Sequence, residues 1–530
     1  MITKKRFLFF LLIVLCIIFL YFIKIIPPIE EEKGILEEIH KNDINLAEIE
    51  STLYQATELD INLTLWDVEP YYNPVENTYY FLISEEYYQQ KLKPKVKILP
   101  EETALTYKYS ILNEDYNKED GLTIKFNEPY EMIVYDESTY YKIPFKITNL
   151  PIINIFPGVE EITTDPAPAI FQIYMKDYDD NIGTSFITSE TMIYVRGRSS
   201  LYYPKKQYRL KLRKDNDYNE VSLLGMEADE DWILDSLYAD NSKIRNKLSF
   251  DLWNQMNSYA PNKYDNDLEM DYVDVYINNE YHGMYLLKEF YDRKKLELEK
   301  NSEEDSGILL KGIQYGEIDW DNYENAKHSQ DVFPFILKYP KNLPDHAKYW
   351  DTILPKVYTN FFEKDKITKD YILNNFFISN YIDYNWLINF IYAADNFEEK
   401  NVYLSMKNMK EDTKVLITPW DLDMTYGYMW GASDTNLVED STLVTDASYL
   451  WTNSDYINKK LKNRYWDLRW TIFTEENINS KIDSYYNKIR HSAKRDSQKW
   501  IEIDLEEEIN KVKDWVNQRI DFLDEEVKNK

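Results

Sequence analysis

One segment of this chain, residues 192–214, carries eight lysine or arginine residues and no acidic residue, in a protein of 530 residues whose net charge is −31. Apolar and basic side chains alternate in its second half, which reads Tyr208, Arg209, Leu210, Lys211, Leu212 and Arg213. Such alternation predicts a β-strand with one buried face and one charged face. Because no acidic residue of the segment compensates the positive charges, we expect these side chains to bind an anion.

The same segment opens with two arginines, Arg196 and Arg198, on either side of Gly197. Guanidinium groups and an open glycine backbone are donors that suit phosphate. A solvated strand edge, on which basic side chains block further pairing, is the other interpretation. We expect Arg196 and Arg198 to contact a phosphorylated cofactor.

A second group of polar residues follows the apolar stretch at 415–417. Asp421 and Asp423 flank Leu422 there, and carboxylates at positions i and i+2 of a strand end point the same way. Two such carboxylates repel each other unless a cation lies between them, and Mg²⁺ prefers oxygen ligands. The pair therefore predicts a magnesium site, whereas a turn in which one aspartate accepts backbone N–H groups is the alternative.

Asp395 ends a long apolar stretch, residues 367–394, that predicts a buried helix. A carboxylate where such a helix opens into a loop can reach an acceptor hydroxyl, and an asparagine a few residues later can reach a metal ion. Asn401 follows Asp395 at six residues. We expect Asp395 to be catalytic and Asn401 to bind the metal; an exposed loop aspartate is the alternative.

Five blocks in this order resemble a known family. They are RGRSS with PKKQYRLKL, LGM leading to DW, YAD leading to RN, YHGMY, and PWDLDMTYG, between residues 168 and 427. Together they resemble the spore-coat protein H (CotH) kinase family, whose known members are kinase-like, bind ATP and magnesium, and in some cases phosphorylate coat proteins. The resemblance implies transfer of the γ-phosphate of ATP to a serine or threonine of a surface or spore-coat protein.

The resemblance also implies roles for single residues. One lysine, Lys205 or Lys206, would hold the nucleotide phosphates, and the metal-binding aspartate would be one of the pair at 421 and 423. Glu289 follows a predicted strand where a kinase-like fold places the link between its lobes, so it faces either the nucleotide sugar or the solvent.

One departure from the family keeps a second function open. Lys400 stands before Asn401, where the family often has a histidine, and two glutamates, Glu398 and Glu399, lie in the same loop. A pseudokinase is therefore the alternative, namely a non-catalytic structural or adhesion protein of the spore or cell surface.

At the N-terminus, three basic residues precede an apolar run at 7–26. About twenty apolar residues span a bilayer as a helix, and the positive flank favours an inside N-terminus. We expect a single-pass membrane anchor with the bulk of the chain outside the cytoplasm; a cleaved signal peptide is the alternative.

Composition excludes several other classes. The acidic balance argues against nucleic acid as a partner, because its phosphates would be repelled. Cys16 is the only cysteine, so neither an intrachain disulfide nor a cysteine-based zinc site can form. A carbohydrate-modifying surface protein has little support, since no carboxylate pair is singled out for glycoside chemistry.

The expected fold class is α+β, with a kinase-like domain of two lobes, one a mixed or antiparallel sheet and the other helical. Proline spacing at 164–168 suggests a linker, whereas the alternation before it predicts strands. The expected parts are a cytoplasmic N-terminus (1–6), the anchor (7–26), a helical stalk (27–58), a β-rich domain (59–165), the kinase-like domain (166–474) and a helical C-terminal segment (475–530).

Overall fold

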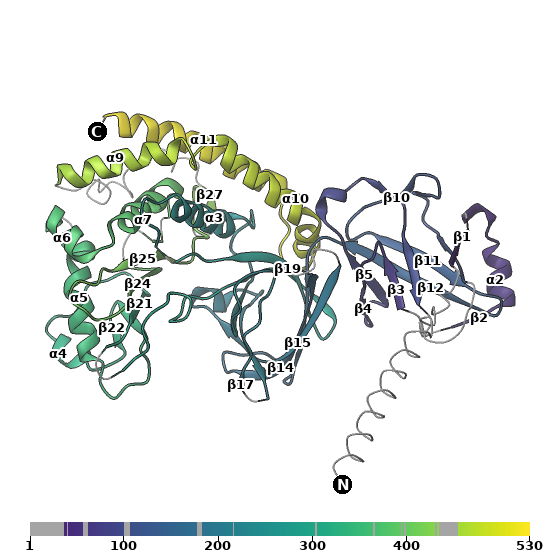
Figure 1. Cartoon of the computed structure of the whole chain (residues 1–530), viewed down its shortest axis with the longest axis horizontal. Coiled ribbons are helices and arrows are strands. Elements are labelled where there is room, and N and C mark those ends of the chain that lie inside the picture. The colour runs from purple at the N-terminus through teal and green to yellow at the C-terminus, as the bar shows by residue number, and fades with distance from the viewer. Residues whose placement is uncertain are drawn as a thin grey trace, which may run out of the picture. The chain divides into compact units, whose positions relative to one another are not determined.

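The computed structural model describes residues 36–39, 41–56, 62–99, 107–177, 183–215, 217–264, 266–302, 305–363, 366–393, 395–396, 399–429, 432–433 and 454–529. The chain divides into an N-terminal unit, residues 1–148 with 182–184, and a C-terminal unit, residues 149–181 with 185–530 (Figure 1). The predicted anchor at 7–26 lies outside the described residues. Among the residues that are described, no helix is both long and apolar enough to span a bilayer.

The N-terminal unit is built on a mixed sheet in the order β1-β8-β11-β12-β5-β4, with β2 paired to β12. Its strands are β1 (Leu36–Glu38), β2 (Tyr54–Gln55), β4 (Tyr71–Asn73), β5 (Thr78–Leu82), β8 (Tyr107–Ile111), β11 (Pro129–Tyr135) and β12 (Thr139–Thr148). Two small sheets pair β3 (Asn62–Leu65) with β7 (Val96–Leu99), and β10 (Gly121–Thr123) with β6 (Lys91–Leu92) and β9 (Tyr116–Asn117). These strands confirm the prediction that the segment before residue 164 is rich in β-structure.

The helical stalk predicted for 27–58 is not what the described part of that segment forms. Strand β1 pairs in parallel with β8, and only a short helix, α2 (Leu46–Thr52), follows. Pairing with a distant strand outweighs the weak helix propensity of an acidic segment, which is a preference of only tenths of a kcal/mol per residue.

The C-terminal unit begins with a sheet in the order β15-β14-β13-β19-β20-β18-β16-β17. Its strands are β13 (Ile152–Pro157), β14 (Ala167–Lys176), β15 (Thr184–Arg196), β16 (Gln207–Lys214), β17 (Asp217–Tyr218), β18 (Asp231–Asp235), β19 (Met270–Ile277) and β20 (Glu280–Lys288). An additional pairing of β15 with β16 closes the sheet into a barrel. Alternate residues such as Leu210, Leu212 and Trp232 form one core cluster, so the charged face of β16 is the outer face.

The division between the units falls before the segment that was expected to be a linker. Strand β13 pairs with β14 and, in parallel, with β19, so it belongs to the barrel. The prolines at 166 and 168 lie at the start of β14, where Gly158 donates its N–H to the Pro168 carbonyl. They mark the end of a connection between two barrel strands, which sequence cannot distinguish from a linker.

Strands β19 and β20 form an antiparallel hairpin. Asn278 and Asn279 form its turn with φ of 53° and 64°, a left-handed conformation that asparagine tolerates better than most residues. Helix α3 (Arg245–Ser258) precedes this hairpin in the chain, and Ile244, Leu248 and Leu252 are buried at its start and along one face.

A second, fully antiparallel sheet has the order β22-β23-β21-β24-β25. Its strands are β21 (Ile308–Gly312), β22 (Asp331–Val332), β23 (Phe335–Tyr339), β24 (Val402–Met406) and β25 (Leu416–Pro419), and the helices around it are α4 (Tyr323–Ala326), α5 (Ala347–Phe362), α6 (Lys369–Asn375) and α7 (Ile378–Ile391). The long helix expected at 367–394 is therefore two helices. Phe376 interrupts it because it bridges to Val415, whose carbonyl accepts the N–H of Phe377.

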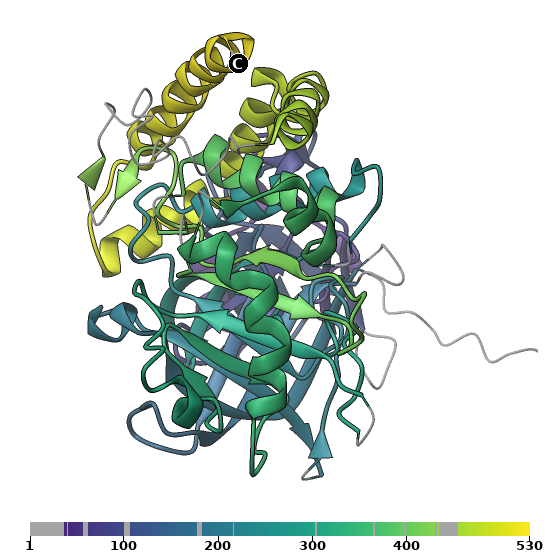
Figure 2. The ribbon, with the colours of Figure 1, turned by 90° about the vertical axis from the view of Figure 1, so that its left-hand side faces the viewer.

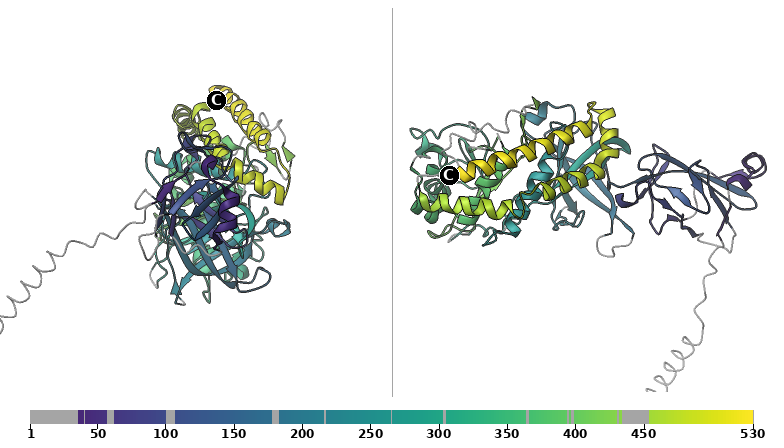
Figure 3. Two further views of the ribbon diagram at one scale, coloured as in Figure 1. Left: turned by 90° about the vertical axis from the view of Figure 1, so that its right-hand side faces the viewer. Right: turned by 90° about the horizontal axis from the view of Figure 1, so that it is seen from above.

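The helical C-terminal segment predicted at 475–530 comprises α10 (Glu475–Lys499) and α11 (Leu505–Asn529), and α9 (Asp455–Arg469) precedes it. Helices α10 and α11 run side by side, which Figures 1 and 3 show from two directions. An apolar stripe of α11 is buried at Ile509, Val512, Val516 and Ile520. Figure 2 shows these helices, in yellow tones, gathered above the strands of the unit. The C-terminal unit is thus of the predicted α+β class.

Candidate functional site

A cavity of about 820 Å³ lies between the outer face of the barrel and the second sheet. Its walls are the end of β15 with the 3₁₀ turn Ser199–Tyr202, the end of β18 with residues 236–240, β21 and β23 with residues 313–314, and the loops at 395–401 and 420–424. Six predicted site residues line it, namely Arg196, Arg198, Asp395, Asn401, Asp421 and Asp423. Residues from distant parts of the chain thus meet in one cavity, which is the arrangement expected of a binding site.

Asp395 is held by three donors and is only 6% exposed. Its Oδ1 accepts hydrogen bonds from Lys400 Nζ (2.5 Å) and Tyr315 Oη (3.0 Å), and its Oδ2 accepts one from Asn401 Nδ2 (2.9 Å). A charged donor and two neutral donors on a buried carboxylate fix its position. The carboxylate is therefore oriented at the cavity wall.

Asn401 owes its position to backbone bonds on both sides. It adopts a φ of 54°, donates its N–H to the Gly312 carbonyl, and accepts the N–H of Trp420. Asn396 joins the same loops, because its Nδ2 donates to the carbonyls of Asn401 (2.9 Å) and Trp420 (2.7 Å). This second asparagine is part of the Asp-Asn pair in the sequence, yet nothing there predicted that it ties the two loops together.

Asp421 and Asp423 lie just after β25 and face the cavity together. Within the described part of the chain, neither carboxylate takes part in a hydrogen bond or an ion pair. Burial raises the pKa of Asp423 well above its usual value, and the negative charges of Asp421, Asp235 and Asp240 raise it further. Asp421 also adopts a φ of 59°, which is uncommon outside glycine and asparagine. Crowded, unpaired carboxylates of this kind suit a divalent cation.

The donor set is small for a metal held by protein alone. Among the described residues, no three His, Cys, Asp or Glu side chains cluster so that they could hold a metal ion. Two carboxylates with the free Oδ1 of Asn401 fit Mg²⁺ best, because it usually keeps waters and phosphate oxygens as its remaining ligands.

The cavity also has cationic lining residues, among them Lys311 of β21, which feels the charge of Asp421. The ammonium lies 5.3 Å from the ring centroids of both Trp420 and Tyr403, and it has no hydrogen-bond or ion-pair partner among the residues that the structure describes. Burial lowers its pKa to about 7, helped by the nearby charges of Arg196 and Lys338. A half-buried cation without a partner is costly unless an anion binds to it.

Comparison with known families gives a match to the family described as CotH kinase protein, over residues 193–523. The chain belongs to this family. The match begins in β15 and ends in α11, so it contains both walls of the cavity. No curated protein matches the chain significantly.

Three residues expected to bind the cofactor do not line the CotH cavity. Lys205 is fully buried and donates to Asp496 Oδ1 (2.6 Å) and the Met284 carbonyl (2.5 Å). Lys206 donates to the Leu201 carbonyl (2.7 Å). Glu289 is paired with Lys295 (2.8 Å) and accepts the N–H of Glu269. The residues between β15 and β16 turn both lysines away, which strand parity alone did not reveal.

Besides Lys311, sequence analysis also missed Lys288, at the end of β20. It forms a buried ion pair with Asp235 (2.7 Å), and its ammonium lies 4.9 Å from the Trp420 ring. Asn246 of α3 donates to Asp235 (3.1 Å) and accepts the Leu422 N–H (3.3 Å). Asn246 thus joins the barrel wall to the loop that carries the two aspartates.

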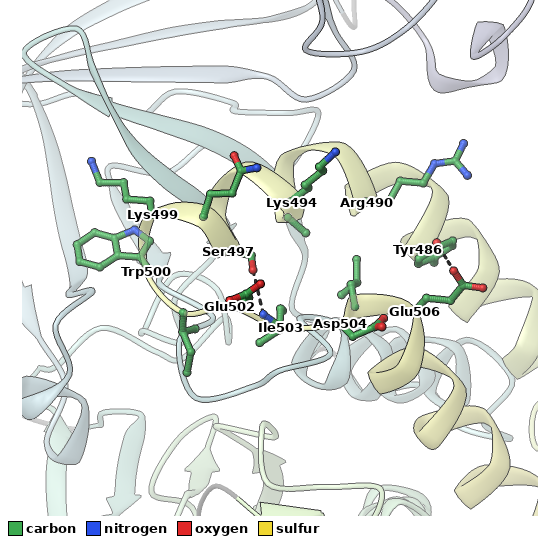
Figure 4. A pocket seen from close by; sticks show the side chains of 14 residues that line it. Tyr486, Arg490, Lys494, Ser497, Lys499, Trp500, Glu502, Ile503, Asp504 and Glu506 are labelled. Carbon is green, nitrogen blue, oxygen red and sulfur yellow. Dashed lines mark hydrogen bonds between the residues drawn. The ribbon is translucent and has the colours of Figure 1, made fainter.

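A second cavity of the CotH region, about 860 Å³, lies where α10 turns into α11 (Figure 4). Its lining combines three basic residues, Arg490, Lys494 and Lys499, with three acidic residues, Glu502, Asp504 and Glu506. None of the predicted site residues lines it. Its charges balance one another, so it has no signature of an anion or cation site.

Proposed function

We propose that this CotH protein is an atypical kinase that binds Mg²⁺-ATP in the cavity and phosphorylates serine or threonine hydroxyls of a surface or spore-coat protein. One observation carries the proposal. The carboxylates of Asp421 and Asp423 and the ammonium of Lys311 have no hydrogen-bond or ion-pair partner among the described residues, and they line the same cavity as the oriented Asp395. Separated sites for a cation and for a polyanion are what phosphoryl transfer from a nucleotide requires.

Each wall has a role in this proposal. Arg196, Lys311 and Lys338 bind phosphate oxygens, while Asp421, Asp423 and Asn401 hold the magnesium ion, which neutralises charge on the phosphates when bound. Asp395 orients the acceptor hydroxyl and takes up its proton. The rings of Tyr203 and Tyr238, 5.2 Å apart, offer an aromatic wall for the base.

In this proposal, the barrel and the sheet-and-helix part of the C-terminal unit are the two lobes of the kinase. The barrel carries Arg196 and Arg198, and the sheet-and-helix part carries Asp395 and the metal-binding residues, so nucleotide would bind between a β lobe and a mainly helical lobe. This is a kinase-like arrangement in function, although the β lobe is a closed barrel.

The first test is calorimetry of ATP binding with and without magnesium. Binding in the wild type that depends on magnesium, and that is lost when Asp421 and Asp423 are both replaced by alanine, is the expected result. Asp395→Asn should keep the binding and lose phosphate transfer. Lys410→Ala, a change of an exposed lysine outside the cavity, is the matched control. Unchanged binding in the double variant would contradict the metal site.

The alternative is a non-catalytic structural or adhesion protein of the spore or cell surface. The small donor set favours it, because among the described residues no third carboxylate or histidine is placed to share a metal ion with the aspartate pair. Absence of binding at millimolar ATP, with or without magnesium, would support this function over the kinase.

We also propose that residues 7–26 anchor the protein in a membrane with the bulk of the chain outside the cytoplasm. The support is the length of the apolar run and its basic flank. Protease accessibility of intact cells or forespores tests the orientation: digestion of the C-terminal unit from outside is expected, and full protection would contradict it.

A further inference from the structure

Lys400 precedes Asn401 in the loop that leads into β24 and lines the cavity. Its ammonium lies 2.5 Å from Asp395 Oδ1. The Lys400 side chain is 24% exposed to solvent, whereas the Asp395 side chain is 9% exposed. The ammonium also lies 5.1 Å from the ring centroid of Tyr315. The ammonium is therefore the more exposed member of an ion pair at the cavity wall.

The hydrogen bonds of Asp395 and Lys400 leave one acceptor site and further N–H donors available for a ligand. Oδ1 of Asp395 is fully used, because its two lone pairs accept from Lys400 and Tyr315. Within the described residues, Oδ2 accepts only from Asn401, which leaves one lone pair for an acceptor hydroxyl. An ammonium has three N–H donors, and Asp395 is the only hydrogen-bond acceptor that Lys400 reaches among the described residues.

We propose that Lys400 is a further catalytic residue, which bridges the Asp395 carboxylate and the phosphoryl group during transfer. One N–H stays on Asp395 Oδ1, and another donates to an oxygen of the γ-phosphate. This inference rests on the proposed kinase function and adds to it a specific charged contact at the transferred group.

The step balances without any further reactant. The acceptor oxygen forms a bond to the γ-phosphorus, and the bond from that phosphorus to the oxygen bridging the β- and γ-phosphates breaks, so ADP leaves. The acceptor proton passes to Asp395 Oδ2 and then to solvent. Lys400 stays protonated throughout and acts through its charge, which is worth most where charge develops and water is excluded.

The test uses the full-length protein in detergent with Mg²⁺-ATP, and measures ADP release with water as the acceptor, transfer of labelled phosphate to the protein itself, and the Kd for Mg²⁺-ATP. We expect Lys400→Met to lower kcat by about 100-fold or more while the Kd changes by less than about threefold. Lys400→Arg should restore at least about a tenth of the activity, since it keeps the charge.

Two further variants separate charge from position. Lys400→Gln keeps a donor for Asp395 but no charge, so it should be as slow as Lys400→Met. Lys407→Ala, an exposed lysine of the same strand region, should leave both kcat and Kd unchanged. A melting temperature for each variant shows that it is folded.

The outcomes distinguish the two proposals. A wild type that neither binds Mg²⁺-ATP nor releases ADP overturns the kinase function and this inference with it. A wild type that turns over, with Lys400→Met or Lys400→Gln retaining more than about a third of kcat, overturns this inference alone. A change in Kd with kcat intact does the same, because it would make Lys400 a binding residue only.

Discussion

Lys311 should make nucleotide affinity depend on pH. Burial and nearby cations lower the pKa of its ammonium to about 7, so the unliganded protein loses this charge as the pH rises through neutrality. The protonated form is the one that attracts phosphate, and above pH 7 binding must therefore take up a proton. We expect the Kd for Mg²⁺-ATP to rise by up to about tenfold per pH unit between pH 7 and 9.

Calorimetry at several pH values measures this dependence, and Lys311→Arg is the matched control because arginine stays charged throughout the range. The variant should bind with little change from pH 6 to 9. An equally steep dependence in Lys311→Arg would assign the effect to another group.

The Asp423 carboxylate should destabilise the unliganded protein. Its folded-state pKa is raised, so at neutral pH its ionised form is less favourable in the folded chain than in the unfolded chain, and this penalty disappears as the pH falls below its usual range. Asp423→Asn should therefore raise the melting temperature in EDTA by about 2 °C. The same variant should lose the stabilisation that magnesium with ATP gives the wild type.

Thermal melts with EDTA and with Mg²⁺-ATP measure both effects, and Asp412→Asn, outside the cavity, serves as the control. A lower melting temperature in EDTA would mean that the Asp423 carboxylate is a structural group.

At this scale the sequence predicted the acidic wall better than the basic one. The spacing of Asp421 and Asp423 carries its own physical reason, because like charges side by side need a cation. Lys311 is a single lysine within an apolar strand and has no such signal, whereas Lys205 and Lys206 drew attention by lying in a basic run. Which lysine faces the cavity depends on the path between β15 and β16, which no local pattern determines.

At the scale of elements, the basic motif that contains Lys205 holds helix α10 against the barrel. Lys205 and the Met284 N–H (2.9 Å) both donate to Asp496 Oδ1. Gly283 makes this approach possible, because a Cβ there would lie 2.6 Å from Asp496 Oδ1 and 2.9 Å from Trp500 Nε1. Two of the family's motifs thus have a structural role in this chain.

Asp496→Ala should therefore destabilise the protein strongly. It leaves the buried Lys205 without its counter-charge, and breaking a buried pair in this way costs about 3–5 kcal/mol. Denaturant unfolding measures the loss, and the Lys205→Met, Asp496→Leu double variant should recover much of it. Nucleotide affinity in the folded variants should be unchanged. If Lys205→Met instead leaves stability intact and weakens ATP binding, Lys205 is a phosphate ligand after all.

Helices were predictable where their own periodicity determines burial, and less so where a distant strand intervenes. The apolar stripe of α11 is visible in sequence because each residue contacts the core at regular spacing. The break between α6 and α7 is not, because Phe376 leaves the helix to pair with Val415 some 40 residues later in the chain.

At the scale of the whole molecule, the unit boundary was the hardest feature to predict. Proline-rich segments are typical of linkers, but the one at 164–168 leads into a barrel strand. Strand β13 joins the barrel through a parallel pairing with β19, more than a hundred residues away, and non-local pairing of this kind leaves no local pattern in the sequence.

This boundary can be tested with two fragments. Residues 149–530 contain every strand of the barrel and every residue of the cavity wall, so this fragment should unfold cooperatively and bind Mg²⁺-ATP with the affinity of the full chain. Residues 166–530 begin at the boundary that sequence alone suggested and lack β13. Without it, β14 and β19 each lose a partner, and the barrel is left open with two unpaired edges and an exposed core.

Circular dichroism and calorimetry compare the two fragments at equal concentration. The shorter one should aggregate or melt without a cooperative transition. If it folds and binds nucleotide as the longer one does, β13 is dispensable, and the closed barrel is not what positions Arg196 and Asp235 at the cavity.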